Sequence, residues 1–172
     1  MTLITNKSAE WLTPRPLFDL LNRTYGPFDL DAAATDENHL CPKWFTKERS
    51  AVARLWRDRV FINPPYGREL PKWMRTIFEH RNESEILVAL IPAKVGTRWW
   101  YHYVARASLI RFLVGRVTFG SADNPHGNPA QFDSVVVVYN RYICKPAPNC
   151  EWANHDYWDW RTELRGDAPL LR

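Results

Sequence analysis

Apolar residues recur three and four positions apart in several segments of the chain, a spacing that predicts helices with one buried face. The clearest segment is 14–25, where Thr13 followed by Pro14 forms a helix-start signal. The same spacing returns over 70–80 and, with aromatic and charged residues, over 97–105. These three segments are therefore expected to be helices.

Short apolar runs rich in β-branched residues lie between these segments and favour buried strands. The most continuous run is 86–91, which ends at Pro92. Because it does not alternate with polar residues, it indicates burial on both faces, as in a parallel sheet covered by helices. Further strands are expected over 60–62, 109–114 and 135–139, with shorter ones at 28–31 and 44–46.

The order of these elements predicts an α/β fold, with a mostly parallel sheet and an antiparallel β-hairpin at one side. The hairpin strands are joined by the segment 120–133, which is rich in Gly, Pro and Asn and is expected to be an adaptable loop. The connection from Asp31 to Asn63 is short for two full strand–helix units. The second and third strands are therefore expected to be abbreviated.

A chain of 172 residues is long enough for one well-buried domain and short for two, so 1–172 is expected to form a single domain. Within it, 1–9 are expected to be a flexible leader and 141–172 an irregular, Trp-rich tail. No stretch approaches the ~18 uncharged apolar residues of a membrane helix, and no apolar signal region is visible, so a cytoplasmic location is expected. The three cysteines match no disulfide or zinc pattern, and no metal is expected.

The net charge of +4 and the pI near 9.1 fit a nucleic-acid partner, although enzymes with neutral substrates share such values. The distribution of charge is more informative. Between residues 86 and 122 the chain contains Lys94, Arg98, Arg116 and two further arginines, and no Asp or Glu. Positive potential is concentrated there, so this segment is expected to contact phosphates.

The segment 60–67, Val-Phe-Ile-Asn-Pro-Pro-Tyr-Gly, ends a buried strand in a proline-rich turn. Proline stops the strand because it has no N–H to continue the ladder, and it fixes its own φ angle. Asn63, the carbonyl of Pro64 and the ring of Tyr66 are thus held close together. Two acceptors beside an aromatic face suit a planar group with an exocyclic amine. Taken alone, the turn also fits an ordinary strand end.

A second polar signal lies at 28–34, Phe-Asp-Leu-Asp-Ala-Ala-Ala. Asp31 is expected at the end of a strand, where the small alanines after it let another molecule come close. Capping of the turn at 35–36 is the alternative. Because ligands of such sheets bind beyond the carboxyl ends of the strands, Asp31 and Asn63 are expected on the same rim.

Several motifs occur in the order seen in the phage and prophage DNA N6-adenine methyltransferases, a Dam-like family that the chain resembles from about residue 10 to residue 140. They are Glu10-Trp11-Leu12-Thr13-Pro14, Phe28-Asp29-Leu30-Asp31-Ala32, Asn63-Pro64-Pro65-Tyr66, Ile91-Pro92-Ala93, Trp99-Trp100, Gly115-Arg116-Val117-Thr118-Phe119 and Phe132-Asp133-Ser134. The resemblance implies a Rossmann-like fold and site-specific methyl transfer from S-adenosylmethionine to N6 of a flipped-out adenine. The glycine-rich donor loop common in methyltransferases is replaced here by 32–34, three alanines.

The resemblance also implies which residues form the site. Asn63, Pro64, Pro65 and Tyr66 are the implied catalytic group. The implied methyl-donor contacts are Glu10, Trp11, Thr13, Asp29, Asp31, Ala32 and Asn63. In the implied chemistry the Asn63 oxygen and the Pro64 carbonyl accept the two N6 hydrogens, so the nitrogen becomes more tetrahedral and its lone pair can attack the methyl group.

Double-stranded DNA is the expected partner, with Tyr66 stacked on the flipped base and Lys94, Arg98 and Arg116 near phosphates. Phe119 or Phe132 is the candidate second aromatic wall, with packing inside the hairpin as the alternative. An RNA adenine and a protein glutamine amide stay open as substrates, since both present a similar planar amine. A catalytically silent nucleic-acid-binding module is the third interpretation. The tail tryptophans would cap the core, stack on bases or bind a second subunit, so a homodimer also stays open.

Overall fold

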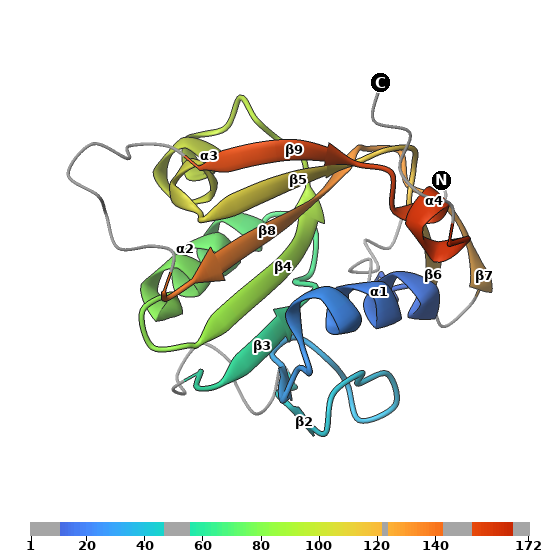
Figure 1. Cartoon of the computed structure of the whole chain (residues 1–172), viewed down its shortest axis with the longest axis horizontal. Coiled ribbons are helices and arrows are strands. Elements are labelled where there is room, and N and C mark those ends of the chain that lie inside the picture. Colours follow the sequence, from blue (N-terminus) through green and yellow to red (C-terminus); the bar gives the residue numbers. More distant parts are fainter. Residues whose placement is uncertain (1–10, 47–55, 122–123, 143–152, 167–172) are drawn as a thin grey trace, which may run out of the picture.

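The computed structural model describes residues 11–46, 56–121, 124–142 and 153–166. A seven-stranded sheet lies at the centre of this part of the chain (Figure 1). The strand order is β2-β1-β3-β4-β8-β5-β9. The strands are β1 (Leu30–Asp31), β2 (Lys43–Trp44), β3 (Arg59–Ile62), β4 (Ile86–Pro92), β5 (Leu109–Leu113), β8 (Ser134–Asn140) and β9 (Asn154–Trp158). Within this sheet only β8 runs against its neighbours, β4 and β5. The predicted α/β fold, with a mostly parallel sheet and an antiparallel pair, is confirmed.

Helices cover the two faces of the sheet (Figure 1). α1 (Arg15–Tyr25) covers one face, and its buried residues follow the predicted helical spacing. α2 (Leu70–His80), α3 (Arg98–His102) and the 3-10 turn η2 (Val104–Arg106) pack on the other. On β3, Phe61 contacts Phe18 of α1, whereas Val60 and Ile62 belong to the core beneath α2. Odd-numbered residues of β3 therefore face α1, because strand side chains alternate.

The region between β1 and β3 is abbreviated, as the sequence predicts. β2 has two residues, Lys43 and Trp44, and pairs in parallel with β1. Residues 47–55 lie outside the described part of the chain. From the sequence, 49–56 is a candidate helical turn before β3, and this segment lies largely outside the described residues.

The predicted adaptable loop at 120–133 is partly a second β-hairpin, so that prediction was wrong for residues 120–121 and 124–129. β6 (Thr118–Ser121) pairs antiparallel with β7 (Asn124–Pro129) in a separate two-stranded sheet. Gly127 has a φ of +69°, and a Cβ there would overlap the Phe119 carbonyl, so glycine is required for the pairing. The many Gly, Pro and Asn residues conceal these strands, because cross-strand backbone bonds rather than an apolar pattern define them.

The tail is also more ordered than the sequence predicts, since β9 and α4 (Trp160–Leu164) lie within 141–172. β9 joins the sheet beside β5, where Asp156 accepts two hydrogen bonds from Nε and Nη2 of Arg111, at 3.0 and 2.8 Å. The Arg161 guanidinium in α4 donates to the carbonyls of Val114 (3.1 Å) and Arg116. Within residues 153–166, the irregular pattern therefore accompanies ordered contacts with β5 and the turn after it.

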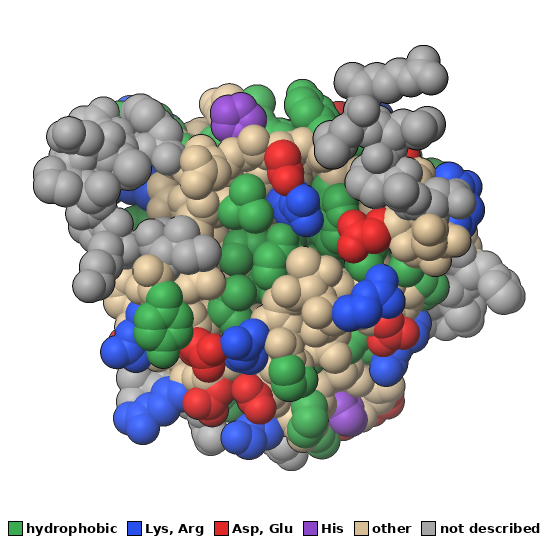
Figure 2. Space-filling model, viewed as in Figure 1, with side chains coloured by type: hydrophobic (Ala, Val, Ile, Leu, Met, Phe, Trp, Pro, Cys, Tyr) green, Lys and Arg blue, Asp and Glu red, His purple; other side chains and the backbone are tan. Residues whose placement is uncertain are grey.

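The face of the molecule shown in Figure 2 has hydrophobic side chains across its middle, with Lys or Arg interspersed among Asp and Glu around them. The positive net charge of the chain is therefore not gathered on this face. Among the described residues, no helix has the length and hydropathy needed to cross a membrane.

Candidate active site

Asn63 lies just beyond the carboxyl end of β3, on the side of the sheet that α1 covers. Its side-chain nitrogen donates two hydrogen bonds, to the carbonyl of Trp11 at 2.7 Å and to Oγ1 of Thr13 at 3.0 Å. Its side-chain oxygen is buried and has no hydrogen-bond partner among the described residues. A buried acceptor without a donor is costly, so this oxygen marks a place where a donor is needed.

The Trp11–Thr13 segment reaches Asn63 because it is tied to β6. Leu12 and Gly120 exchange two backbone hydrogen bonds, at 2.9 and 3.2 Å. Three segments far apart in the sequence therefore meet at Asn63: the start of the described chain, the turn after β3, and the region from β6 to residue 132.

Four aromatic rings gather beside Asn63, and we call them the aromatic cluster: Trp11, Tyr66, Phe119 and Phe132. Tyr66 lies edge to face with Phe132 (5.3 Å between ring centroids) and with Phe119 (5.9 Å). The ring of Trp11 lies 5.9 Å from that of Phe119 and 6.1 Å from that of Phe132. All four were predicted site residues, and the structure brings them together.

Tyr66 is fixed by its hydroxyl, which donates to the Leu90 carbonyl of β4 at 3.1 Å. Burial raises the pKa of this phenol well above its usual value of 10.0, so it stays protonated at neutral pH. The hydroxyl is directed into the protein as a donor and is not a base. The contribution of Tyr66 to a site is therefore its ring.

The two phenylalanine candidates differ in exposure. Phe119 is 1% exposed and belongs to the buried core on the side of the sheet that α1 covers. Phe132 is half-buried and keeps part of its ring accessible. Phe132 is thus the residue able to meet a ligand, while Phe119 supports it and Trp11 from the protein interior.

Asp31 ends β1 and is 3% exposed. Its two carboxylate oxygens accept backbone hydrogen bonds from Ala33 (3.3 Å) and Leu40 (3.2 Å), so the loop that follows is folded around this side chain. Burial raises the pKa of Asp31 from 3.8 to about 6, and the two N–H donors and His39 oppose that rise. The predicted position at a strand end is therefore observed, with the carboxylate turned toward its own loop.

The other residues predicted to contact the methyl donor do not lie together. Asp29 accepts a hydrogen bond from the Arg59 N–H at 3.2 Å, at the amino end of β3, and so stands apart from Asn63. Ala32 is fully buried, and its N–H donates to the Phe61 carbonyl at 2.9 Å. Glu10 lies outside the described residues. Of this group, Trp11 and Thr13 are the residues that reach Asn63.

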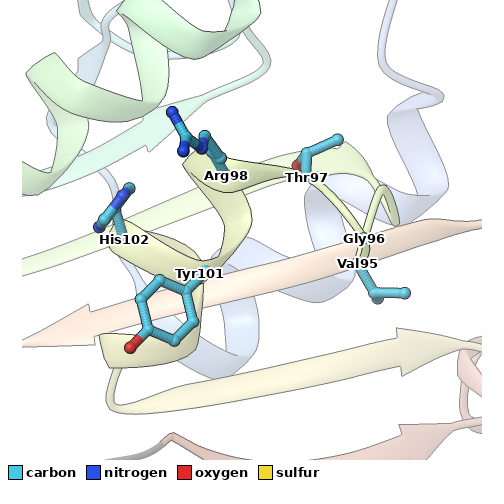
Figure 3. Close-up of a pocket in the computed structure, with 6 residues that line it drawn as sticks. All are labelled: Val95, Gly96, Thr97, Arg98, Tyr101 and His102. Carbon is cyan, nitrogen blue, oxygen red and sulfur yellow. The ribbon is translucent and has the colours of Figure 1, made fainter.

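The predicted phosphate-binding residues lie on two segments. Lys94 and Arg98 are exposed after β4, whose carboxyl end lies on the same edge of the sheet as that of β3. Figure 3 shows the open hollow there, with Arg98 and His102 one turn apart on the same side of α3. Arg116 is instead partly engaged, because it pairs with Asp133 at 3.2 Å and donates to the Ala130 carbonyl at 3.1 Å.

Several groups that shape the site were missed from the sequence. They include the carbonyls of Trp11 and Leu90 and the backbone of Gly120, because no sequence signal marks a backbone atom that bonds to a distant side chain. The Thr-Pro pair at 13–14 did mark the position of Thr13, although as a helix start. In the described part of the chain, no group of three or more His, Cys, Asp or Glu side chains could hold a metal ion.

Comparison with known proteins was consistent with the site. Residues 2–157 match the family model described as DNA N-6-adenine-methyltransferase (Dam). The DNA N-6-adenine-methyltransferase of Escherichia phage T1 is 37% identical over 112 residues, which cover 63% of this chain and 46% of that protein. The enzyme of the same name from Haemophilus phage HP1 is 28% identical over 120 residues, covering 67% of this chain and 69% of that protein.

A third relative, the putative methyltransferase YfdM of Escherichia coli K12, is 36% identical over 64 residues, or 33% of this chain. The chain thus spans about half the length of the phage T1 relative and about two thirds of the other two. The family match covers the sheet, the Asn63 turn and the aromatic cluster. The chain belongs to the DNA N-6-adenine-methyltransferase (Dam) family, as its motifs predicted.

Proposed function

We propose that this protein transfers a methyl group from S-adenosylmethionine to N6 of an adenine flipped out of double-stranded DNA. The observation that carries the proposal is the buried, unpaired side-chain oxygen of Asn63 beside the aromatic cluster. An exocyclic amine supplies the missing donor, and the aromatic cluster offers a ring on which a planar base can stack. The names of the phage relatives support DNA adenine as the substrate.

The residues of the Asn63 turn prepare the amine. The amine nitrogen, N6 of adenine, is a weak nucleophile because its lone pair is delocalised into the ring. Hydrogen bonds from the two N–H groups to the Asn63 oxygen and the Pro64 carbonyl favour a tetrahedral nitrogen, whose lone pair is then localised. A new N–C bond forms as the methyl–sulfur bond breaks, and the nitrogen loses its extra proton to water. Neither Asn63 nor the protonated Tyr66 has to act as a base.

S-adenosylmethionine is the methyl donor that membership of this family implies, and when bound it supplies an electrophilic sulfonium methyl group. The residues at the end of β1 fit such a molecule, because Ala33 and Ala34 are small, half-buried and level with Asn63 on the neighbouring strand. Asp31 would keep the loop around the donor in shape through its two backbone hydrogen bonds. The unpaired Asn63 oxygen lies on the same rim.

DNA would approach over the loop after β4, where Lys94 and Arg98 are exposed at the edge of the sheet that carries Asn63. Contacts of these cations with phosphates position the duplex and do not read its sequence. Phe132 would give the base a second aromatic contact after moving away from Tyr66, because Phe132 is half-buried and the two rings now touch edge to face at 5.3 Å.

The test is a methyl-transfer assay with labelled S-adenosylmethionine and, in separate reactions, duplex DNA, RNA and a protein extract. The expected result is label in DNA as N6-methyladenine, lost in Asn63→Ala. Asn140→Ala is the matched control, because Asn140 makes a local backbone bond at the opposite edge of the sheet. Label in RNA or protein but not DNA would change the substrate class, and DNA binding without any label would contradict the enzyme proposal.

A further inference from the structure

The geometry points to Thr13 and the Trp11 carbonyl as positioning groups: they fix the orientation of the Asn63 amide, so that only a hydrogen-bond acceptor faces the substrate. This inference rests on the proposed function and deepens it. It also gives Thr13 a role other than contact with the methyl donor. The site would thereby select an amino group over an oxo group.

The first step is the count of hydrogen bonds at the Asn63 nitrogen. A side-chain amide nitrogen carries two hydrogens, and here it has two partners at 2.7 and 3.0 Å. Both donors are therefore used on the protein side. Only the oxygen is left to meet a ligand, and it is the atom without a partner among the described residues.

The second step is the cost of the opposite orientation. If the amide turned over, its oxygen would face the Trp11 carbonyl, which can only accept. Two buried acceptors would then oppose each other, and each would lack a donor. The Thr13 hydroxyl alone could adapt to either orientation, so the carbonyl sets the direction while the hydroxyl satisfies the second N–H.

The third step is the rigidity of the positioning groups. Leu12, between them, exchanges two backbone hydrogen bonds with Gly120 of β6. Pro14 follows with a φ of −58°, and its carbonyl accepts from the Phe18 N–H at the start of α1. The segment is thus held between the second hairpin and α1, and it has little freedom to follow a rotating amide.

The consequence is selectivity for the group that enters. An amine donates to the Asn63 oxygen, whereas an oxo group would place a second acceptor against it and leave both without donors. Adenine has an amine at the position where hypoxanthine has an oxygen. The Asn63 amide would therefore reject the deaminated base by electrostatics.

The test compares Thr13→Val, which removes the hydroxyl and keeps the shape, with Thr13→Ser, which keeps the hydroxyl. We expect Thr13→Val to lower kcat for DNA by about 5- to 10-fold, the loss of one hydrogen bond, and Thr13→Ser to restore most of it. The Kd for S-adenosylmethionine, measured by calorimetry, should change by less than about twofold, since the hydroxyl is used on Asn63. Thr24→Val is the matched control, because the Thr24 hydroxyl bonds to the Leu20 carbonyl in α1.

A second measurement does not depend on activity. In protein labelled at asparagine nitrogen, NMR should show slow exchange with solvent for both Asn63 side-chain amide hydrogens, and faster exchange for one of them in Thr13→Val. Thermal unfolding of each variant separates this local effect from loss of the fold. Slow exchange in an inactive wild type would leave the positioning role intact while contradicting the proposed function.

Three outcomes would overturn the inference with the enzyme active: Thr13→Val with wild-type kcat, failure of Thr13→Ser to rescue a folded protein, or a large rise in the Kd for S-adenosylmethionine. A large rise in this Kd would indicate that Thr13 contacts S-adenosylmethionine directly. Equal exchange of the Asn63 amide hydrogens in wild type and Thr13→Val would also overturn it.

Discussion

Asp31 ends β1, and Asn63 follows the neighbouring parallel strand β3. The two residues differ in how their side-chain polar atoms are hydrogen-bonded. Both oxygens of Asp31 accept hydrogen bonds from the loop that follows it. Asn63 has its nitrogen bound to a distant segment and its oxygen left without a partner among the described residues. A position beyond the carboxyl end of a strand is therefore not enough to give a residue a role in catalysis or ligand binding. What matters is which atoms the protein itself leaves unsatisfied.

The largest expected effect separates the two residues by rate. Asn63→Ala removes the acceptor for the amine, so kcat should fall by about 10²-fold or more, while the fold is kept. The measurement is methyl transfer to duplex DNA at saturating S-adenosylmethionine, together with thermal unfolding. If Asn63→Ala instead lost stability and kept its rate per folded molecule, the contrast with Asp31 would break.

Asp31 should reveal itself through stability and pH. Burial raises its pKa from 3.8 to about 6, so at pH 5 the folded protein holds a proton there that the unfolded chain releases. Relative to Asp31→Asn, the wild type should therefore gain stability as the pH falls from 7 to 4, by about 2 kcal/mol. Urea unfolding at several pH values measures this difference, with Asp19→Asn on the exposed side of α1 as the control. If the difference in unfolding free energy between the wild type and Asp31→Asn stays constant with pH, burial does not raise the pKa of Asp31.

Phe132 tests whether a base stacks on the aromatic cluster beside Asn63. Phe132→Ala should raise KM for DNA by about 10-fold, since base–aromatic stacking is worth about 1–3 kcal/mol. Tyr157→Ala is the control, because Tyr157 is an exposed aromatic on β9. An equal effect of the two variants on KM would mean that Phe132 has no special contact with the substrate.

Arg98 should give the smallest effect. Arg98→Ala is expected to weaken DNA binding by a few-fold at low salt and to reduce the slope of log K against log salt by about one, the signature of one lost phosphate contact. Arg23→Ala, at the far end of α1, should leave the slope unchanged. Equal slopes for wild type and Arg98→Ala would move the phosphate contacts to another surface.

The sequence predicted what local chemistry determines. β3 ends just before Asn63 and the two prolines that follow it, Pro92 is the last residue of β4, and the apolar run of 86–91 identifies the central strand. The same local logic placed Asp31 at a strand end. These features depend on neighbours in the chain, so the letters alone reveal them.

What escaped prediction depends on long-range pairing. Asn63 and the Trp11 carbonyl are 52 positions apart, and no pattern in either segment names the other. β9 reads as polar because Asp156 is matched to Arg111, 45 positions away. β6 and β7 contain few apolar residues because their pairing depends on backbone hydrogen bonds and on Gly127. In each case the structure of a segment depends on a second segment that is distant in the sequence.

The position of β8 has a consequence for the order in which the protein can assemble during its synthesis. In this sheet β8 is the strand that joins β4 to β5, through seven paired positions on the β4 side, from Ile86 with Asn140 to Pro92 with Ser134. A ribosome has to pass residue 140 before β4 gains its second neighbour. The Leu90 carbonyl that fixes Tyr66 belongs to that waiting strand. The Asn63 site of the nascent chain should therefore lack its complete support until residue 140 has been synthesised.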